Sequence, residues 1–145
     1  MEKTRKVVHE IEVRFRDIDS MGHVNNAVFL TYFEEGRQIF LRDVFNIIDP
    51  KDYPFILAHI DCDFLKPMKL GDSPVLEVWI GEIREKSFAF TYRIVERLDR
   101  TVVYTKGKSV MVLFDYKKNK SIPIPKDFLE KIMAYGDKGQ ERTSA

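Results

Sequence analysis

Polar side chains of several chemically useful types gather in one short connection, RDIDSMGHVNN at residues 16–26. Two carboxylates are followed by a glycine, a histidine and two adjacent amides, namely Asp17, Asp19, Gly22, His23, Asn25 and Asn26. A carboxylate can act as a general base or as a nucleophile. The connection is therefore the first place in this sequence to look for an active site.

The expected start of a helix at Asn26 adds a second chemical feature to this connection. The first N–H groups of a helix have no partner within it and carry partial positive charge. Gly22 lets the loop fold back tightly. A carbonyl oxygen could then accept a hydrogen bond from the N–H groups at Asn26, while a carboxylate faces the carbonyl carbon. Taken singly, Asp17 and Asp19 also suit a solvated turn, and Asn25 suits a helix cap. Their combination favours the catalytic interpretation.

Two segments must position this connection. Before it, apolar and charged residues alternate from Val7 to Phe15, which predicts a half-buried strand. After it, residues 26–45 contain no proline and repeat apolar side chains at helical spacing, which predicts a helix. Gly36 falls on the apolar stripe of that helix, and a glycine there is plausible if a strand packs closely against it.

Four further strands are expected after the helix, at residues 55–65, 74–84, 87–98 and 101–115. Their short polar connections predict antiparallel pairing. A short helix is expected at residues 126–135, and the tail at about 136–145 is expected to be disordered. This order predicts a single α+β domain over residues 1–145, with an antiparallel sheet of about five strands wrapped around one long central helix.

Composition excludes several classes of protein. The 24 Lys and Arg residues balance 23 Asp and Glu residues, which argues against a nucleic-acid-binding protein. One cysteine, Cys62, excludes an internal disulfide framework. No apolar run approaches the roughly 20 residues that span a bilayer, and the charged N-terminus lacks a signal-peptide core. We therefore expect a cytoplasmic protein without a membrane partner. The histidines lack the compact spacing of metal ligands, and neither a metal nor a cofactor is predicted.

The segment VRFRDIDSMGHVNNAVFLTYFEEGR, residues 13–37, resembles the hallmark of the 4-hydroxybenzoyl-CoA thioesterase family. The shared features are a strand ending in D-x-D, a G-H-V-N-N-like loop and a helix that carries Y-F-E. The H-V-N-N stretch is also similar to plant acyl-ACP thioesterases. Later stretches, PMKLGDSPVLEV and REKSFAFTYRI, are similar to later strands of the family. The resemblance covers about residues 8–130.

This resemblance implies a hotdog fold and catalytic roles within the connection. Asp19 matches the family's catalytic aspartate, and Asn26 matches the position whose backbone N–H polarises the thioester carbonyl. Asn25, which could orient water, and His23, which could hydrogen-bond nearby, are further catalytic candidates. The resemblance also implies a homodimer or homotetramer with active sites at the subunit interface.

Substrate contacts are expected from residues outside the connection. Arg84, Lys86 and Ser87 match a segment of the family near the nucleotide end of CoA. Three further candidates could shape the pocket or add a titratable group: Tyr32, Glu34 and His59.

The sequence therefore predicts a hydrolase that converts an acyl-CoA or acyl-ACP thioester into free acid and thiol. Asp19 is expected to act as base or nucleophile. One alternative is a hydratase or dehydratase of acyl thioesters, with His23 or His59 paired with a carboxylate. Another is a non-catalytic module that binds acyl-CoA, because fold alone does not establish an activity.

Overall fold

Residues 5–136 are described by the structure, a computed structural model, and they form an antiparallel sheet with two α-helices. The helices are α1 (Asn26–Phe45) and α2 (Lys126–Met133). The strands are β1 (Val7–Glu10), β2 (Phe55–Phe64), β3 (Pro74–Ile83), β4 (Ser87–Glu96), β5 (Val103–Asp115) and β6 (Lys120–Ser121). From residue 137 on, the tail that was expected to be disordered lies outside the described residues.

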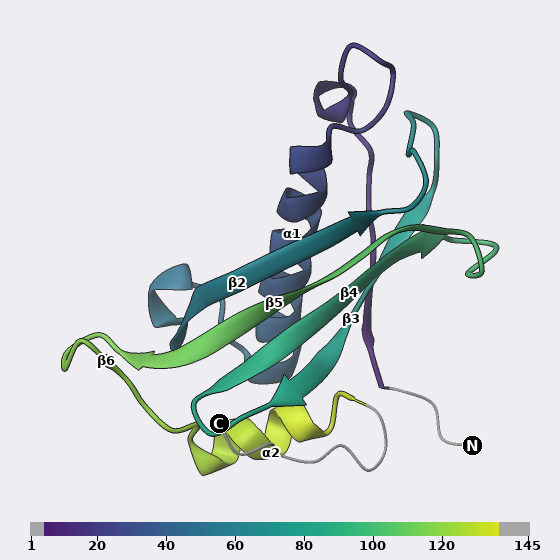
Figure 1. Cartoon of the computed structure of the whole chain (residues 1–145). Coiled ribbons are helices and arrows are strands. Elements are labelled where there is room, and N and C mark those ends of the chain that lie inside the picture. The colour runs from purple at the N-terminus through teal and green to yellow at the C-terminus, as the bar shows by residue number, and fades with distance from the viewer. Residues whose placement is uncertain (1–4, 137–145) are drawn as a thin grey trace.

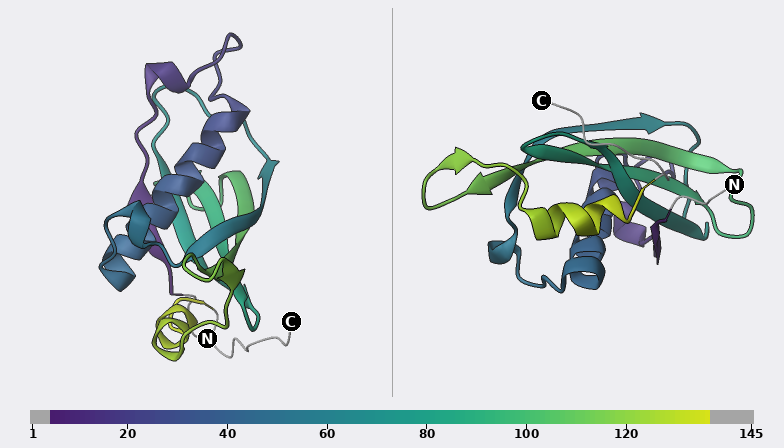
Figure 2. Two further views of the ribbon diagram at one scale, coloured as in Figure 1. Left: turned by 90° about the vertical axis from the view of Figure 1, so that its left-hand side faces the viewer. Right: turned by 90° about the horizontal axis from the view of Figure 1, so that it is seen from below.

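The sheet has the strand order β1-β3-β4-β5-β2, and every neighbouring pair is antiparallel. The two-residue strand β6 pairs only with β5. The sheet curves around one face of α1, and α2 lies on the same side of the sheet near one end (Figures 1 and 2). The predicted α+β fold, with a sheet wrapped around a long helix, is confirmed. Its exposed edges are β1 and β2.

The core lies between α1 and the concave face of the sheet. Alternate side chains of β4 point into it, because successive residues of a strand face opposite sides, and Phe88, Phe90, Tyr92 and Ile94 are buried. Phe33 of α1 stacks on Tyr92 with the ring centroids 4.3 Å apart. These contacts hold α1 against the concave face of the sheet.

The first strand ends earlier than the sequence predicts. It stops at Glu10 instead of Phe15, and a 3-10 turn at Phe15–Asp17 follows. The backbone hydrogen bonds between this segment and β3 end with the one from the Ile11 N–H to the carbonyl of Pro74, the first residue of β3. Beyond that point no partner strand remains, so the alternation past Ile11 does not produce a strand, and Phe15 is 83% exposed. Neither helix of the described part is long and apolar enough to cross a membrane.

Candidate active site

Residues 17–25 form a tight loop between the 3-10 turn and α1, at the upper end of the molecule in Figure 1. The Asp19 N–H donates to the His23 carbonyl at 2.8 Å. Gly22 has φ +79°, a left-handed conformation that favours glycine, and this lets the chain reverse within the loop. The Val24 N–H donates to the Met68 carbonyl at 2.7 Å and ties the loop to the β2–β3 connection.

The Asp19 carboxylate is held in this loop by one of its two oxygens. Its Oδ1 accepts hydrogen bonds from the backbone N–H groups of Met21 at 2.9 Å and His23 at 3.2 Å. Within residues 5–136, Oδ2 has no hydrogen-bond partner. The carboxylate is therefore fixed in orientation and keeps one oxygen for chemistry.

The start of α1 keeps one backbone donor beside this carboxylate. The Asn25 side chain caps the helix, because its Oδ1 accepts from the Ala27 N–H at 2.9 Å. The Val28 N–H donates to the Asn25 carbonyl at 2.9 Å. That leaves the Asn26 N–H without a partner among the residues described. Asn25 thus has the structural role of a cap, and it leaves Asn26 as the free donor.

A pocket of about 210 Å³ brings Asp19 and Asn26 together. Its polar lining comes from Asp19, His23, Asn26 and Lys66. Its apolar lining comes from Met21, Val24, Phe29, Phe64, Leu65 and Pro67. The pocket thus places a carboxylate, a helix N–H and an apolar wall side by side, which suits an ester or thioester with an apolar acyl group.

The first carboxylate of the loop, Asp17, has different partners. Its Oδ2 accepts from the Tyr32 hydroxyl at 2.7 Å and from the Arg14 N–H at 3.0 Å. Its carbonyl accepts from the Asn25 N–H at 2.9 Å. Burial and then the hydrogen bond to Asp17 raise the pKa of Tyr32 above its ordinary value, so that its hydroxyl remains a donor. Neither residue lines the pocket of Asp19.

Three of the expected substrate contacts lie away from this pocket. Tyr32 is buried under the loop, and its hydroxyl is used by Asp17. Glu34 is exposed on α1. His59 is exposed on β2, where its Nε2 lies 3.0 Å from Asp61 Oδ2. The pocket is therefore lined by Asp19, His23 and Asn26. Tyr32, Glu34 and His59 do not line it.

The expected CoA-binding segment lies at the other end of the sheet. Arg84 and Ser87 line a separate hollow of about 270 Å³, and the Arg84 Nε donates to Glu82 Oε1 at 3.2 Å. Lys86 is exposed, and its carbonyl accepts from the Leu113 N–H. The β3–β4 connection lies near α2, at the end of β3 opposite to the loop (Figure 1).

Sequence reasoning missed the pocket residues supplied by the end of β2 and the connection after it. These are Phe64, Leu65, Lys66 and Pro67. No motif marks them, and they reach the pocket because the β2–β3 connection is bonded to the loop through Val24 and Met68. The pairing of the two loops is a tertiary contact, so local spacing does not predict it.

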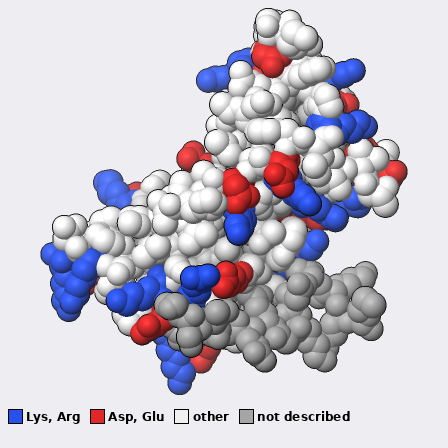
Figure 3. Space-filling model, in the orientation of Figure 1, with Lys and Arg blue, Asp and Glu red and all other residues white. Residues whose placement is uncertain are grey.

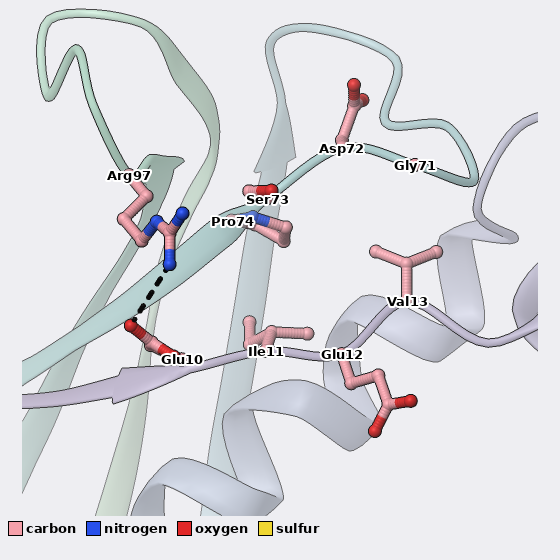
Figure 4. A pocket seen from close by; sticks show the side chains of 9 residues that line it. All are labelled: Glu10, Ile11, Glu12, Val13, Gly71, Asp72, Ser73, Pro74 and Arg97. Atoms are coloured by element: carbon pink, nitrogen blue, oxygen red, sulfur yellow. Dashed lines mark ion pairs between the residues drawn. The ribbon is translucent and has the colours of Figure 1, made fainter.

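A second hollow within residues 5–136 lacks this combination of groups. A hollow of about 470 Å³ between the end of β1 and the start of β3 contains three carboxylates, those of Glu10, Glu12 and Asp72 (Figure 4). Its cation Arg97 lies 3.5 Å from Glu10. The negative charge of this hollow does not suit an anionic substrate.

Charge on the outer face of the sheet is mixed. Acidic and basic side chains are interspersed over the face shown in Figure 3. In the register of the sheet, Asp61 and Asp63 of β2 lie opposite Lys108 and Lys106 of β5. No three His, Cys, Asp or Glu side chains between residues 5 and 136 are grouped to hold a metal ion.

Comparisons with known proteins cover most of this chain. A family model, the thioesterase-like superfamily, matches residues 13–132. The long-chain acyl-CoA thioesterase FadM of Escherichia coli is 26% identical over 125 residues, 85% of this chain and 94% of that protein. The acyl-CoA thioesterase YbgC of Haemophilus influenzae is 23% identical over 121 residues, 81% of this chain and 87% of that protein.

A solved structure is similar over nearly the whole chain. It is a thioesterase of Thermus thermophilus in complex with coenzyme A and Zn, and it is 30% identical. It aligns with a TM-score of 0.78 over 93% of this chain and 97% of that chain.

Proposed function

This chain belongs to the thioesterase-like superfamily, and we propose that it hydrolyses acyl-CoA thioesters at the pocket lined by Asp19 and Asn26. The observation that carries the proposal is the pairing of two unused groups in one pocket. These are the Asp19 carboxylate oxygen Oδ2 and the Asn26 N–H, neither of which is bonded within the described residues. The relatives named as acyl-CoA thioesterases support the substrate class.

The two groups suit the two needs of thioester hydrolysis. The substrate carbonyl oxygen accepts a hydrogen bond from the Asn26 N–H, whose donor strength the helix dipole increases. Asp19 Oδ2 takes a proton from water as the water oxygen attacks the carbonyl carbon. The C–S bond then breaks, the acid is released, and the proton goes to the CoA thiolate. In the nucleophilic variant Oδ2 attacks first, the thiolate leaves, and water hydrolyses the resulting anhydride.

Lys66 adds a positive charge to the pocket lining. CoA esters carry several phosphate charges, and a lysine in the pocket lining attracts them. The apolar side chains Phe29, Phe64 and Leu65 supply the wall for the acyl group. Phe29 and Phe64 lie with their ring centroids 5.7 Å apart, so the wall joins α1 to β2.

A second copy of the chain completes the site in this proposal. Strand β2 is an edge of the sheet, with its backbone available for pairing. Exposed apolar side chains lie along this strand and just after it: Ile56, Leu57, Phe64 and Leu65. Pairing of two copies along β2 would cover these side chains. It would also allow Arg84 and Lys86 of one copy to serve the catalytic loop of the other, which supports an active site at the subunit interface.

Release of free thiol from acyl-CoAs of increasing length, with Asp19→Asn alongside, tests the proposal. Asparagine keeps an oxygen for the backbone N–H groups of Met21 and His23 and replaces only the free oxygen, so this variant is expected to fold. Asp72→Asn is the matched control, because its Oδ2 likewise accepts a backbone N–H, that of Lys69 at 2.8 Å.

We expect Asp19→Asn to lower kcat by about 10²- to 10⁴-fold, the usual range for a general base, while Asp72→Asn does not change it. An unchanged rate in a folded Asp19→Asn protein would refute the role of Asp19. Hydration of an enoyl-CoA without thiol release by the wild type would overturn the hydrolase assignment.

A further inference from the structure

The buried hydroxyl of Tyr32 is bonded to the loop that carries Asp19. Tyr32 is 3% exposed, and its hydroxyl lies 2.7 Å from Asp17 Oδ2. The same Asp17 residue accepts the Asn25 N–H through its carbonyl at 2.9 Å. Asp17 is therefore attached to α1 at two points, the cap residue and Tyr32.

We propose that Tyr32 is a positioning residue, whose hydroxyl holds Asp17 so that the next carboxylate, Asp19, stands beside the Asn26 N–H. The proposal rests on thioester hydrolysis at this pocket and adds to it a division of work between the two carboxylates. Asp17 anchors the loop, and Asp19 performs the chemistry.

The helix geometry explains why two attachments are needed. Asn25 and Tyr32 are separated by seven positions, which is two turns and about 10 Å along the helix axis, on one face. The bond at Asn25 holds the Asp17 carbonyl at the start of the helix. A second bond at Tyr32 fixes the direction of the loop, and Ile18, paired with Val24, transmits that direction to Asp19.

The bonds of Asp17 also explain why a tyrosine is needed rather than another aromatic residue. The Tyr32 ring packs edge-on against Phe29, and phenylalanine would keep that contact. Only the hydroxyl reaches Asp17. A buried hydroxyl without a partner is costly, and here both hydroxyl and carboxylate are satisfied by each other. Asp17 Oδ2 also accepts the Arg14 N–H, which extends the anchor to the start of the 3-10 turn.

Tyr32→Phe tests the proposal by separating kcat from KM. We expect kcat to fall about tenfold with KM unchanged, the effect of losing one well-placed hydrogen bond to a charged group. Amide hydrogen exchange gives a readout besides activity: the Asn25 N–H should exchange faster in the variant. Tyr116→Phe is the matched control, because it also removes a hydroxyl, one that donates to the Phe55 carbonyl at 3.0 Å. It should leave kcat and the exchange of Asn25 unchanged.

Variants of Asp17 test the division of work. Asp17→Asn keeps an oxygen that accepts from Tyr32 and Arg14, and it should retain kcat within about threefold. Asp17→Ala should lose at least as much as Tyr32→Phe, because it also removes the acceptor of the Arg14 N–H. The double variant should lose no more than Asp17→Ala alone, because Asp17→Ala already removes the contact with Tyr32.

Each outcome decides the proposal. Unchanged kcat and unchanged Asn25 exchange in Tyr32→Phe would mean that Tyr32 only packs, and a raised KM at constant kcat would make it a substrate contact. Either result overturns the proposal. If the wild type releases no thiol, thioester hydrolysis fails, and the exchange of Asn25 still decides whether Tyr32 holds the loop.

Discussion

Gly36 of α1 faces Leu76 of β3 so closely that a Cβ added at Gly36 would lie 2.5 Å from Leu76 Cδ2. The same Cβ would lie 2.8 Å from Val78 Cγ2. Leu76 and Val78 are both fully buried and have little room to move. The helix therefore approaches the sheet at a distance that only glycine permits, as its place on the apolar stripe predicts.

We expect Gly36→Ala to lower the free energy of unfolding by about 1–3 kcal/mol through overpacking. This loss opposes the gain of about 1 kcal/mol that alanine brings to a helix interior. Urea denaturation followed by circular dichroism measures it, with Gln38→Ala at an exposed position of α1 as control. A more stable Gly36→Ala protein would contradict the close contact.

Substitutions of Asn25 should separate helix capping from catalysis. Asn25→Ala removes the acceptor for the Ala27 N–H and should cost about 1 kcal/mol of stability. Asn25→Asp keeps an acceptor and should keep that stability. Its negative charge beside the Asn26 N–H should still lower kcat, because it opposes the charge that develops on the carbonyl oxygen. Equal kcat for Asn25→Asp and wild type would argue against an oxyanion site at this helix start.

Glu77 should make stability depend on pH. It is buried, and its carboxylate contacts Lys6 at 3.1 Å and Arg93 and Arg100 at 2.9 Å each. Burial alone would raise the pKa of Glu77, but the hydrogen bonds from these cations outweigh it and lower the pKa. A lowered folded-state pKa stabilises the protein above the unfolded-state pKa, and this stabilisation is lost as the pH falls through the folded-state value.

Glu77→Gln should therefore cost about 2 kcal/mol at pH 7, because it removes the negative charge that pairs with three cations. The difference from wild type should shrink as the pH falls through the lowered folded-state pKa of Glu77, where the carboxylate of the wild type becomes protonated. Urea denaturation at several pH values measures it. A difference that stays constant with pH would show that the cations do not stabilise the ionised form.

Lys66 should act on substrate binding rather than on the chemical step. It lines the pocket, but the proposed hydrolysis does not use it to transfer a proton. We expect Lys66→Ala to raise KM for acyl-CoA about fivefold, the effect of one partly exposed charge contact, and to weaken the dependence of KM on salt. Lys118, in the turn before β6, is the control for a lysine far from the loop. A fall in kcat at constant KM would contradict this assignment.

Leu57→Lys should prevent the proposed pairing along β2. Leu57 is 46% exposed on this edge strand, and lysine on a sheet edge opposes pairing with another strand. We expect a monomer in analytical ultracentrifugation and a loss of thiol release. Leu98→Lys, in the connection after β4 and 86% exposed, should change neither property. A fully active monomer would show that one chain carries the complete site.

The sequence by itself determined the order of the main helices and strands and the loop that carries the candidate site. The alternation of β4, the helical spacing of α1 and the short links between strands are local properties, so they are visible without a structure. Asp19 lies in the loop that leads into α1, seven residues before Asn26 at the helix start, so the sequence already places the two residues close together along the chain.

Only the tertiary structure decided the partners of these residues. The first strand ends early because β3 begins at Pro74, and Lys66 enters the pocket because Val24 bonds Met68. The two carboxylates of D-x-D look alike in the sequence, and Tyr32 makes them different by bonding one and leaving the other. Hydrogen bonds between segments far apart in the chain depend on how those segments pack, and residue spacing does not record that packing.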